Sequence, residues 1–95
     1  MNDNKKIELS DLKDVIDVEK LEREKPNIVI VAIRCEECGK IHPFIFVDEM
    51  LYFMTHYSSW HQYRKCDCGN EVSVYAGHGD IVYNPHNHKV IGVSE

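Results

Sequence analysis

The sequence contains no cluster of lysine and arginine. Its 95 residues include 11 basic and 16 acidic side chains, and the formal net charge is −5. The excess of acid is spread along the chain and does not form an acidic tail. Proteins that bind duplex DNA neutralise phosphates with grouped basic side chains. We therefore expect no appreciable binding to duplex DNA at physiological salt.

Long apolar runs are absent as well. No segment of the chain reaches the roughly 18 apolar residues that a membrane-spanning helix needs. The chain begins Met-Asn-Asp-Asn-Lys-Lys and continues into charged sequence, which differs from the apolar core of a secretion signal. These absences predict a cytoplasmic protein with no membrane partner.

Catalytic motifs are also missing. The Gly77-His78-Gly79 segment is too short for a phosphate-binding loop and has no lysine after it. No serine lies in the Gly-x-Ser-x-Gly context of a nucleophile elbow. We predict that the protein is not an enzyme. The alternative is a small metal-dependent enzyme built on the histidine-rich C-terminal end, and it requires His78, Asp80 and His86 to line one cleft.

Cysteine is scarce, but its four copies are arranged in two tight pairs. Cys35 and Cys38 are followed by Gly39, and Cys66 and Cys68 are followed by Gly69. Two such pairs, held in turns, place four sulfurs around one tetrahedral metal ion. We predict that Zn²⁺ is bound by all four thiolates: Cys35, Cys38, Cys66 and Cys68.

Three alternatives to structural zinc exist for these cysteines. Iron in a four-thiolate site has the same geometry, and zinc is favoured over it. A redox dithiol at Cys35 and Cys38 would leave the second pair unexplained, and no thioredoxin-type pattern surrounds it. A catalytic zinc needs an open coordination position, which four cysteines would fill.

The histidines offer a second candidate site. His78, His86 and His88 all fall in the last eighteen residues, close to Asp80 in sequence. They could hold a second metal ion, although no strict ligand spacing is present and solvated loop histidines are favoured. His42, near the first cysteine pair, could replace a ligand if Cys66 or Cys68 did not reach the metal.

The remaining pattern predicts a small α+β domain covering residues 1–95. We expect a helix over 8–25 that is ended by Pro26, with a bend or an early end as the alternative because its apolar stripe rotates. A buried strand over 28–33 follows. A returning strand over 40–47 contains Pro43 and so either lies at a sheet edge or starts late. The apolar spacing of Met50, Phe53, Met54 and Tyr57 predicts a helix over 48–61 with these side chains buried. A strand over 71–76 follows, and 81–83 pairs with 89–93 in a hairpin.

This layout resembles the zinc-ribbon superfamily. The matching residues lie within 28–76 and comprise Cys35, Cys38, Gly39, Cys66, Cys68 and Gly69. The resemblance implies a small antiparallel sheet around a structural metal, with an N-terminal helical segment (1–27), a helix inserted between the knuckles, and a C-terminal hairpin or tail (77–95). The short second pair and the inserted helix depart from the plain ribbon. Zinc ribbons include nucleic-acid binders, transcription subunits and structural modules, so function stays open.

Our leading hypothesis is a zinc-stabilised module that binds another protein. Its negative charge suits a partner with a basic surface, including a nucleic-acid-handling protein that it regulates or inhibits. The alternative is a nucleic-acid-binding zinc ribbon for single strands or RNA. That function would need a basic cluster beside exposed aromatics such as Trp60 or Tyr63, formed by Arg34, Lys40, Arg64 and Lys65. The sequence does not indicate an oligomeric state.

Overall fold

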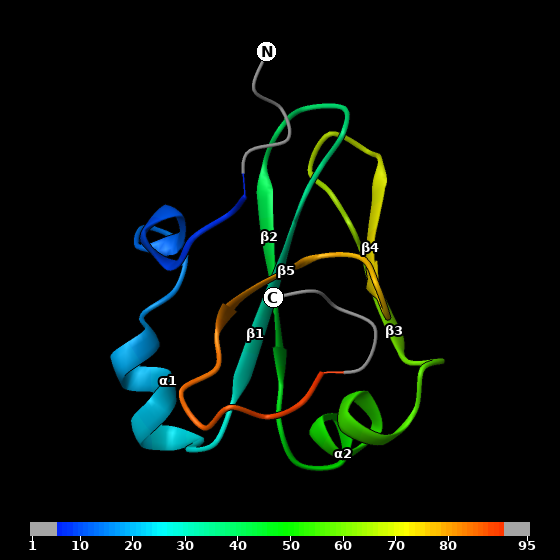
Figure 1. The fold of residues 1–95 in the computed structure, drawn as a ribbon. Helices are drawn as coiled ribbons and strands as arrows, with labels where there is room; N and C mark the ends of the chain where they lie inside the picture. Colours follow the sequence, from blue (N-terminus) through cyan, green and yellow to red (C-terminus); the bar gives the residue numbers. More distant parts are fainter. Residues whose placement is uncertain (1–5, 91–95) are drawn as a thin grey trace.

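The computed structural model describes residues 6–90, which form a small α+β fold (Figure 1). The predicted fold class is therefore confirmed. A short 3₁₀ helix, η1, precedes the two α-helices. The elements in chain order are η1 Leu9–Leu12, α1 Val18–Glu24, β1 Val29–Arg34, β2 Ile41–Phe46, α2 Asp48–His56, β3 His61–Lys65, β4 Glu71–Tyr75 and β5 Asp80–Tyr83.

Strand β1 is the centre of the fold. It pairs antiparallel with β2 on one side and β5 on the other, in a three-stranded sheet of order β2-β1-β5. Its residues are buried on both faces, as the unbroken apolar run predicts. Odd-numbered side chains such as Val29 and Val31 enter one core, while Ile28, Ile30 and Ala32 enter another. Both cores of the molecule therefore pack on this strand.

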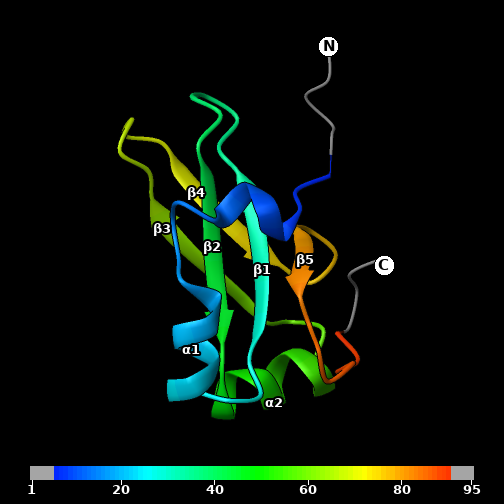
Figure 2. The same cartoon turned by 90° about the vertical axis from the view of Figure 1, so that its left-hand side faces the viewer.

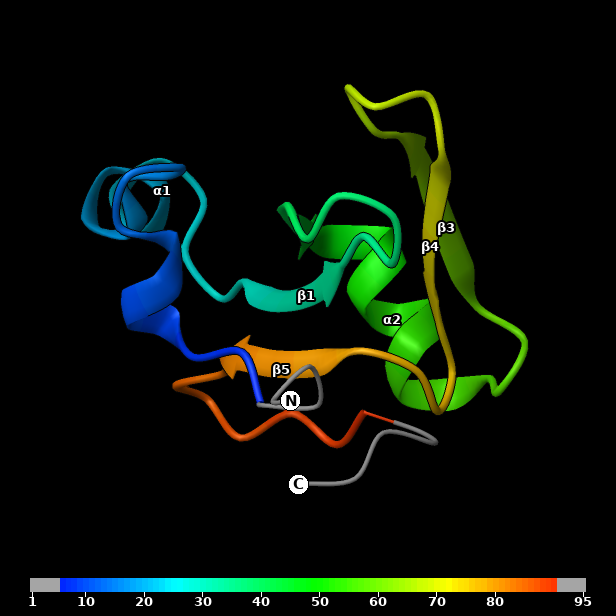
Figure 3. The same cartoon turned by 90° about the horizontal axis from the view of Figure 1, so that it is seen from above.

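Strands β3 and β4 form a separate two-stranded hairpin. Figure 3 shows this hairpin to one side of β1 and β5. Val72 and Val74 point from β4 into the larger core, where they join Phe44 and Phe46 from β2 and Trp60. Phe46 and Trp60 meet edge to face, with ring centroids 5.5 Å apart. The hairpin is thus attached to the sheet by apolar packing and not by a shared strand ladder.

Gly79 allows this close approach of hairpin and sheet. A Cβ atom at this position would lie 2.7 Å from Val74 Cγ2 and 2.8 Å from Val31 Cγ1, closer than real Cβ contacts. Its φ of +127° also suits glycine alone. A side chain here would push β4 away from β1.

The N-terminal segment differs from the single predicted helix over 8–25. The chain instead forms η1, a turn, and the shorter helix α1 (Figure 2). Asp17 starts α1 by accepting a hydrogen bond from the Lys20 amide at 3.1 Å. Leu12 is fully buried in the second core, and the Tyr83 hydroxyl donates to Glu22, which ties α1 to β5. The break lets the chain follow the face of the sheet.

Helix α2 corrects a second prediction. It ends at His56 and not at 61, and it buries Leu51 and Met54. Phe53 is 50% exposed and Tyr57 is 46% exposed, so the predicted buried stripe was wrong at both. Five consecutive apolar residues from Met50 to Met54 surround the helix axis, so spacing alone does not select the buried side.

The C-terminal segment also pairs differently from the prediction. Strand β5 pairs with β1 and not with a strand over 89–93. Lys89 and Val90 have no strand structure, and 91–93 lie outside the described residues. Val90 packs into the larger core. In the described part of the chain, no helix has the length and apolar character to cross a bilayer.

Pro43 lies on an edge strand, as predicted. Cys35 donates its amide to the Lys40 carbonyl at 2.8 Å, which sets the hydrogen-bonding phase of the β1–β2 ladder. Pro43 opposite Ala32 then falls at a position whose backbone groups point away from β1. The missing N–H therefore costs the ladder nothing.

The burial of α2 predicts unequal effects for two adjacent residues. Met54→Ala should lower the free energy of unfolding by about 2–5 kcal/mol, because Met54 is fully buried. Phe53→Ala should cost less than about 1 kcal/mol, because half of its side chain is exposed. Urea unfolding of the two variants measures both values. A larger loss for Phe53→Ala would contradict this orientation of α2.

Candidate metal centre

The two cysteine pairs lie on the turns of two hairpins, at the same end of the molecule. One turn joins β1 to β2 and the other joins β3 to β4. The turns lie side by side at the top of both Figure 1 and Figure 2. Two cysteine pairs that are separated by 27 residues of chain therefore meet where the two sheets come together.

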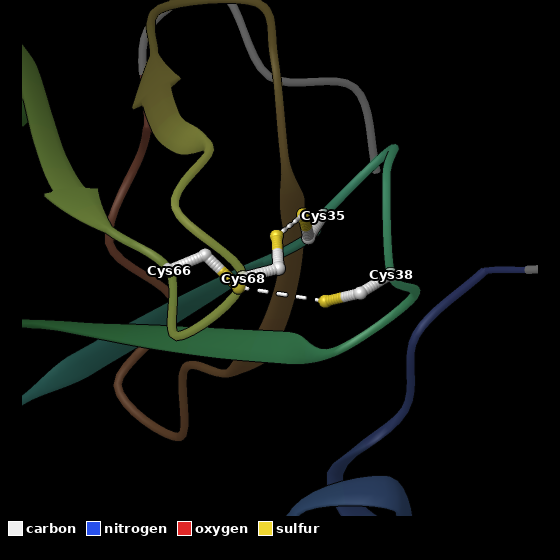
Figure 4. A group of neighbouring side chains, drawn as sticks. All are labelled: Cys35, Cys38, Cys66 and Cys68. Carbon is white, nitrogen blue, oxygen red and sulfur yellow. Dashed lines mark hydrogen bonds between the residues drawn. The ribbon is translucent and has the colours of Figure 1, made fainter.

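The four sulfur atoms converge on one point (Figure 4). All lie within 4.8 Å of one another. The Cys35 and Cys68 Sγ atoms are 3.6 Å apart, and those of Cys38 and Cys66 are 3.5 Å apart. A tetrahedron with metal–sulfur bonds of about 2.3 Å places its sulfurs about 3.8 Å apart. The cluster has the spacing that one metal ion needs.

Both turns are built in the same way, although the second is one residue shorter. The Gly39 amide donates to the Cys35 carbonyl at 2.9 Å, and the Gly69 amide donates to the Cys66 carbonyl at 2.9 Å. These bonds span four residues in the first turn and three in the second. Both glycines have positive φ, +82° and +96°. The shorter Cys66–Cys68 pair therefore still presents two sulfurs, and the predicted replacement of a ligand by His42 is not needed.

Backbone and side-chain N–H groups surround the Cys35 sulfur. The amide of Cys38 is the main cause that lowers the pKa of the Cys35 thiol to about 6; burial opposes it. Asn70 Nδ2 also lies 3.8 Å from this sulfur. In contrast, the pKa of Cys68 is raised to about 12. The largest single contribution, a hydrogen bond from the Asn70 amide, lowers this pKa, but burial and the neighbouring thiols together raise it by more.

An ion pair connects the tips of the two turns. Lys40 Nζ lies 2.5 Å from Asp67 Oδ2. This contact raises the pKa of Lys40 and lowers that of Asp67. Both side chains are largely exposed, so the pair contributes little to stability. Neither this pair nor Asn70 was among the predicted site residues, although both positions neighbour the cysteines in sequence.

His42 is buried beside this end of the sheet. Its Nε2 atom has no hydrogen-bond partner in the described part of the chain. Burial is the largest cause that lowers the pKa of His42, and the charges of Arg64 and Lys40 lower it further. His42 is therefore a neutral core residue next to the centre.

The alternative of a second metal site at His78, His86 and His88 is not found among the described residues, in line with the favoured interpretation that these are loop histidines. Among residues 6–90, the four cysteines are the one group of three or more potential ligands at metal-binding distance. His78 stacks on Tyr75, and His86 Nε2 lies 3.8 Å from Glu22 Oε2. His88 Nε2 lies 2.7 Å from Asn27 Oδ1.

The cleft required by the enzyme alternative is also incomplete. His78 and Asp80 line one cavity of about 570 Å³ beside Cys35. His86 lies near Glu22 of α1. Tyr83 also contacts Glu22, and Tyr83 is at the end of β5 opposite to Asp80. Asp80 already accepts a hydrogen bond from the Ile7 amide at 2.9 Å.

The basic residues named for nucleic-acid binding are mostly engaged elsewhere. Lys40 pairs with Asp67, and the Arg64 guanidinium lies 4.5 Å from the centroid of the Phe44 ring. Arg34 lines a hollow together with Glu36 and other acids. Trp60 is buried, whereas Tyr63 is 63% exposed.

Comparison with protein-family models, with curated proteins and with solved structures found no match. The four-thiol cluster is therefore the feature from which a functional argument starts. Its geometry makes the chain a candidate metal-binding module.

The unequal thiol pKa values predict how the metal-free protein titrates. Because Cys35 has a pKa of about 6, it should already be a thiolate at neutral pH and should gain a proton as the pH falls through 6. Cys68 should stay a thiol across this range. Thiolate ultraviolet absorbance of metal-free protein measures the step, and Cys35→Ser should abolish it. An unchanged step in that variant would assign the low pKa to another cysteine.

Proposed function

We propose that this protein is a small zinc-stabilised module, related in architecture to zinc ribbons, that binds another protein. The observation that carries the proposal is the convergence of four thiols from two hairpin turns within 4.8 Å. Four sulfur donors suit Zn²⁺, which prefers tetrahedral thiolate sites, and iron would fit the same geometry. Zinc is favoured because it serves a structural role without redox chemistry.

A metal here would stabilise the fold and perform no chemistry on a substrate. Bound zinc would form two zinc–sulfur bonds to each hairpin turn and so would join the two hairpins. Four cysteine sulfurs would fill every position around a tetrahedral ion, so no place would be left for a reactive water. The four residues are Cys35, Cys38, Cys66 and Cys68. Cys35 and Cys66 are buried, and Asn70 supports the Cys35 sulfur from outside the ligand set. These features support a structural centre and a non-enzymatic role.

The charge of the protein supports a basic partner. The chain carries −5 before metal binding. Four thiolates with one Zn²⁺ add about −2 more at the end where the hairpins meet. An acidic protein attracts basic surfaces and repels phosphates, which favours a protein partner over a nucleic acid. A nucleic-acid-handling protein with a basic groove is one partner of this kind, and occupying that groove would regulate it.

The metal proposal predicts about one zinc per chain in freshly purified protein. Cys38→Ser should reduce metal content and the cooperativity of thermal unfolding, because metal binding contributes folding energy. Elemental analysis and calorimetry measure the two effects, and Ser58→Ala serves as an exposed control outside the cluster. Metal-free protein that unfolds with the same transition as purified protein would refute a structural metal.

The partner proposal predicts retention of a basic protein by the zinc-loaded chain. Affinity capture from native lysate should retain a protein that nuclease treatment does not release and that moderate salt does, because salt screens charge attraction. Bound proteins are identified by mass spectrometry. Material that is lost after nuclease treatment would instead favour the nucleic-acid alternative.

A further inference from the structure

Strand β4 has one edge that pairs with β3 and another that carries no neighbouring strand in the described structure. The Cys66 amide donates to the Asn70 carbonyl, and the Ala76 amide donates to the Trp60 carbonyl. These bonds fix the hydrogen-bonding phase of the hairpin. Because antiparallel pairs alternate, the backbone groups of Glu71 and Ser73 point away from β3.

These outward backbone groups are unoccupied. Within residues 6–90, no turn, loop or side-chain hydrogen bond engages the backbone of Glu71 or Ser73. Tyr75, the next outward residue, is different, because its amide and carbonyl pair with His78. The open edge therefore runs along Glu71 and Ser73 and ends at the Tyr75–His78 bridge.

A hollow of about 300 Å³ lies along this edge. Its walls come from β4 and from the end of β1 with the first cysteine turn. Ile33 and Val72 provide an apolar part of the lining. Space beside unpaired strand groups is what an added strand requires.

The charge of the hollow specifies its occupant. Glu36, Glu37 and Glu71 line it against one cation, Arg34, which leaves a net charge of −2. All three glutamates are exposed, and none forms an ion pair within the described residues. Lysine or arginine side chains of an extended segment would meet unpaired carboxylates here.

We propose that an extended, basic segment of a partner protein binds in this hollow as an additional strand on the free edge of β4. The inference rests on the proposed protein-binding function and names its site and ligand chemistry. The Ser73 and Glu71 backbone groups would pair with the segment, and the glutamates would select for basic residues. Alternation would direct the segment's side chains to the two faces of the hairpin.

The test uses the full zinc-loaded chain and a short synthetic peptide that alternates lysine and valine. Amide hydrogen exchange by NMR should slow about tenfold or more at Ser73 and Glu71 when the peptide is bound, because these amides gain partners. Val72, whose amide already faces β3, serves as the internal reference. A matched peptide with glutamate in place of lysine should produce no protection.

Two double variants test the role of charge. Glu36→Gln with Glu37→Gln should weaken binding of the lysine peptide roughly fivefold, since two exposed ion pairs contribute about 1 kcal/mol. Asp48→Asn with Glu49→Gln removes the same charge from exposed positions on α2 and should leave the affinity unchanged. Zinc content is measured in every variant, so that loss of the metal is not mistaken for loss of the site.

Several outcomes would overturn the inference. These are a Ser73 amide that is protected in the free protein, binding without protection at Ser73, an equal effect of the α2 variant, or no binding of the lysine peptide. The first would mean that the chain covers its own edge. None of them would decide the proposed function, which is judged separately by zinc content and by capture of a basic partner.

Discussion

The packing of the β3–β4 hairpin against the β2-β1-β5 sheet is the interaction that brings the four cysteine sulfurs together. The β2-β1-β5 sheet and the β3–β4 hairpin share no strand pairing, so backbone hydrogen bonds do not fix one against the other. Val72, Val74 and Trp60 hold the hairpin by burial, which is non-directional. A metal ion bound by the four cysteines would add a directional constraint at one end. A chain of 95 residues buries a limited surface, so such a constraint has a large relative effect on stability.

The sequence predicted the cluster of four cysteines because its signal is local. A few adjacent residues and a glycine are enough to predict each cysteine turn. The only long-range inference is that the two turns lie side by side. Strand β1 was also predictable, since an unbroken apolar run fits a strand that is buried on both faces. The four cysteines lie as close together as that reasoning required.

The errors occurred where the information is not local. In α2, apolar residues surround the axis, and the contact of Leu51 and Met54 with the sheet selects the buried side. The pairing of β5 with β1 joins residues about fifty positions apart, and strand periodicity does not name a partner. Gly79 precedes β5, and its lack of a side chain lets Val31 and Val74 lie close to it. The role of this glycine depends on contacts with residues that are distant in sequence.

The sheet edges differ in a way that bears on binding. On β2, Pro43 occupies an outward position and removes a donor from that edge, a common protection against unwanted pairing. The open edge of β4 carries no proline and is bordered by glutamates instead. Like charges repel the same edge of a second copy while attracting a basic strand, so they discourage self-association without closing the site. In the proposed binding mode, the edge of β4 would stay open to a basic strand, whereas Pro43 removes one donor that an added strand on β2 would need.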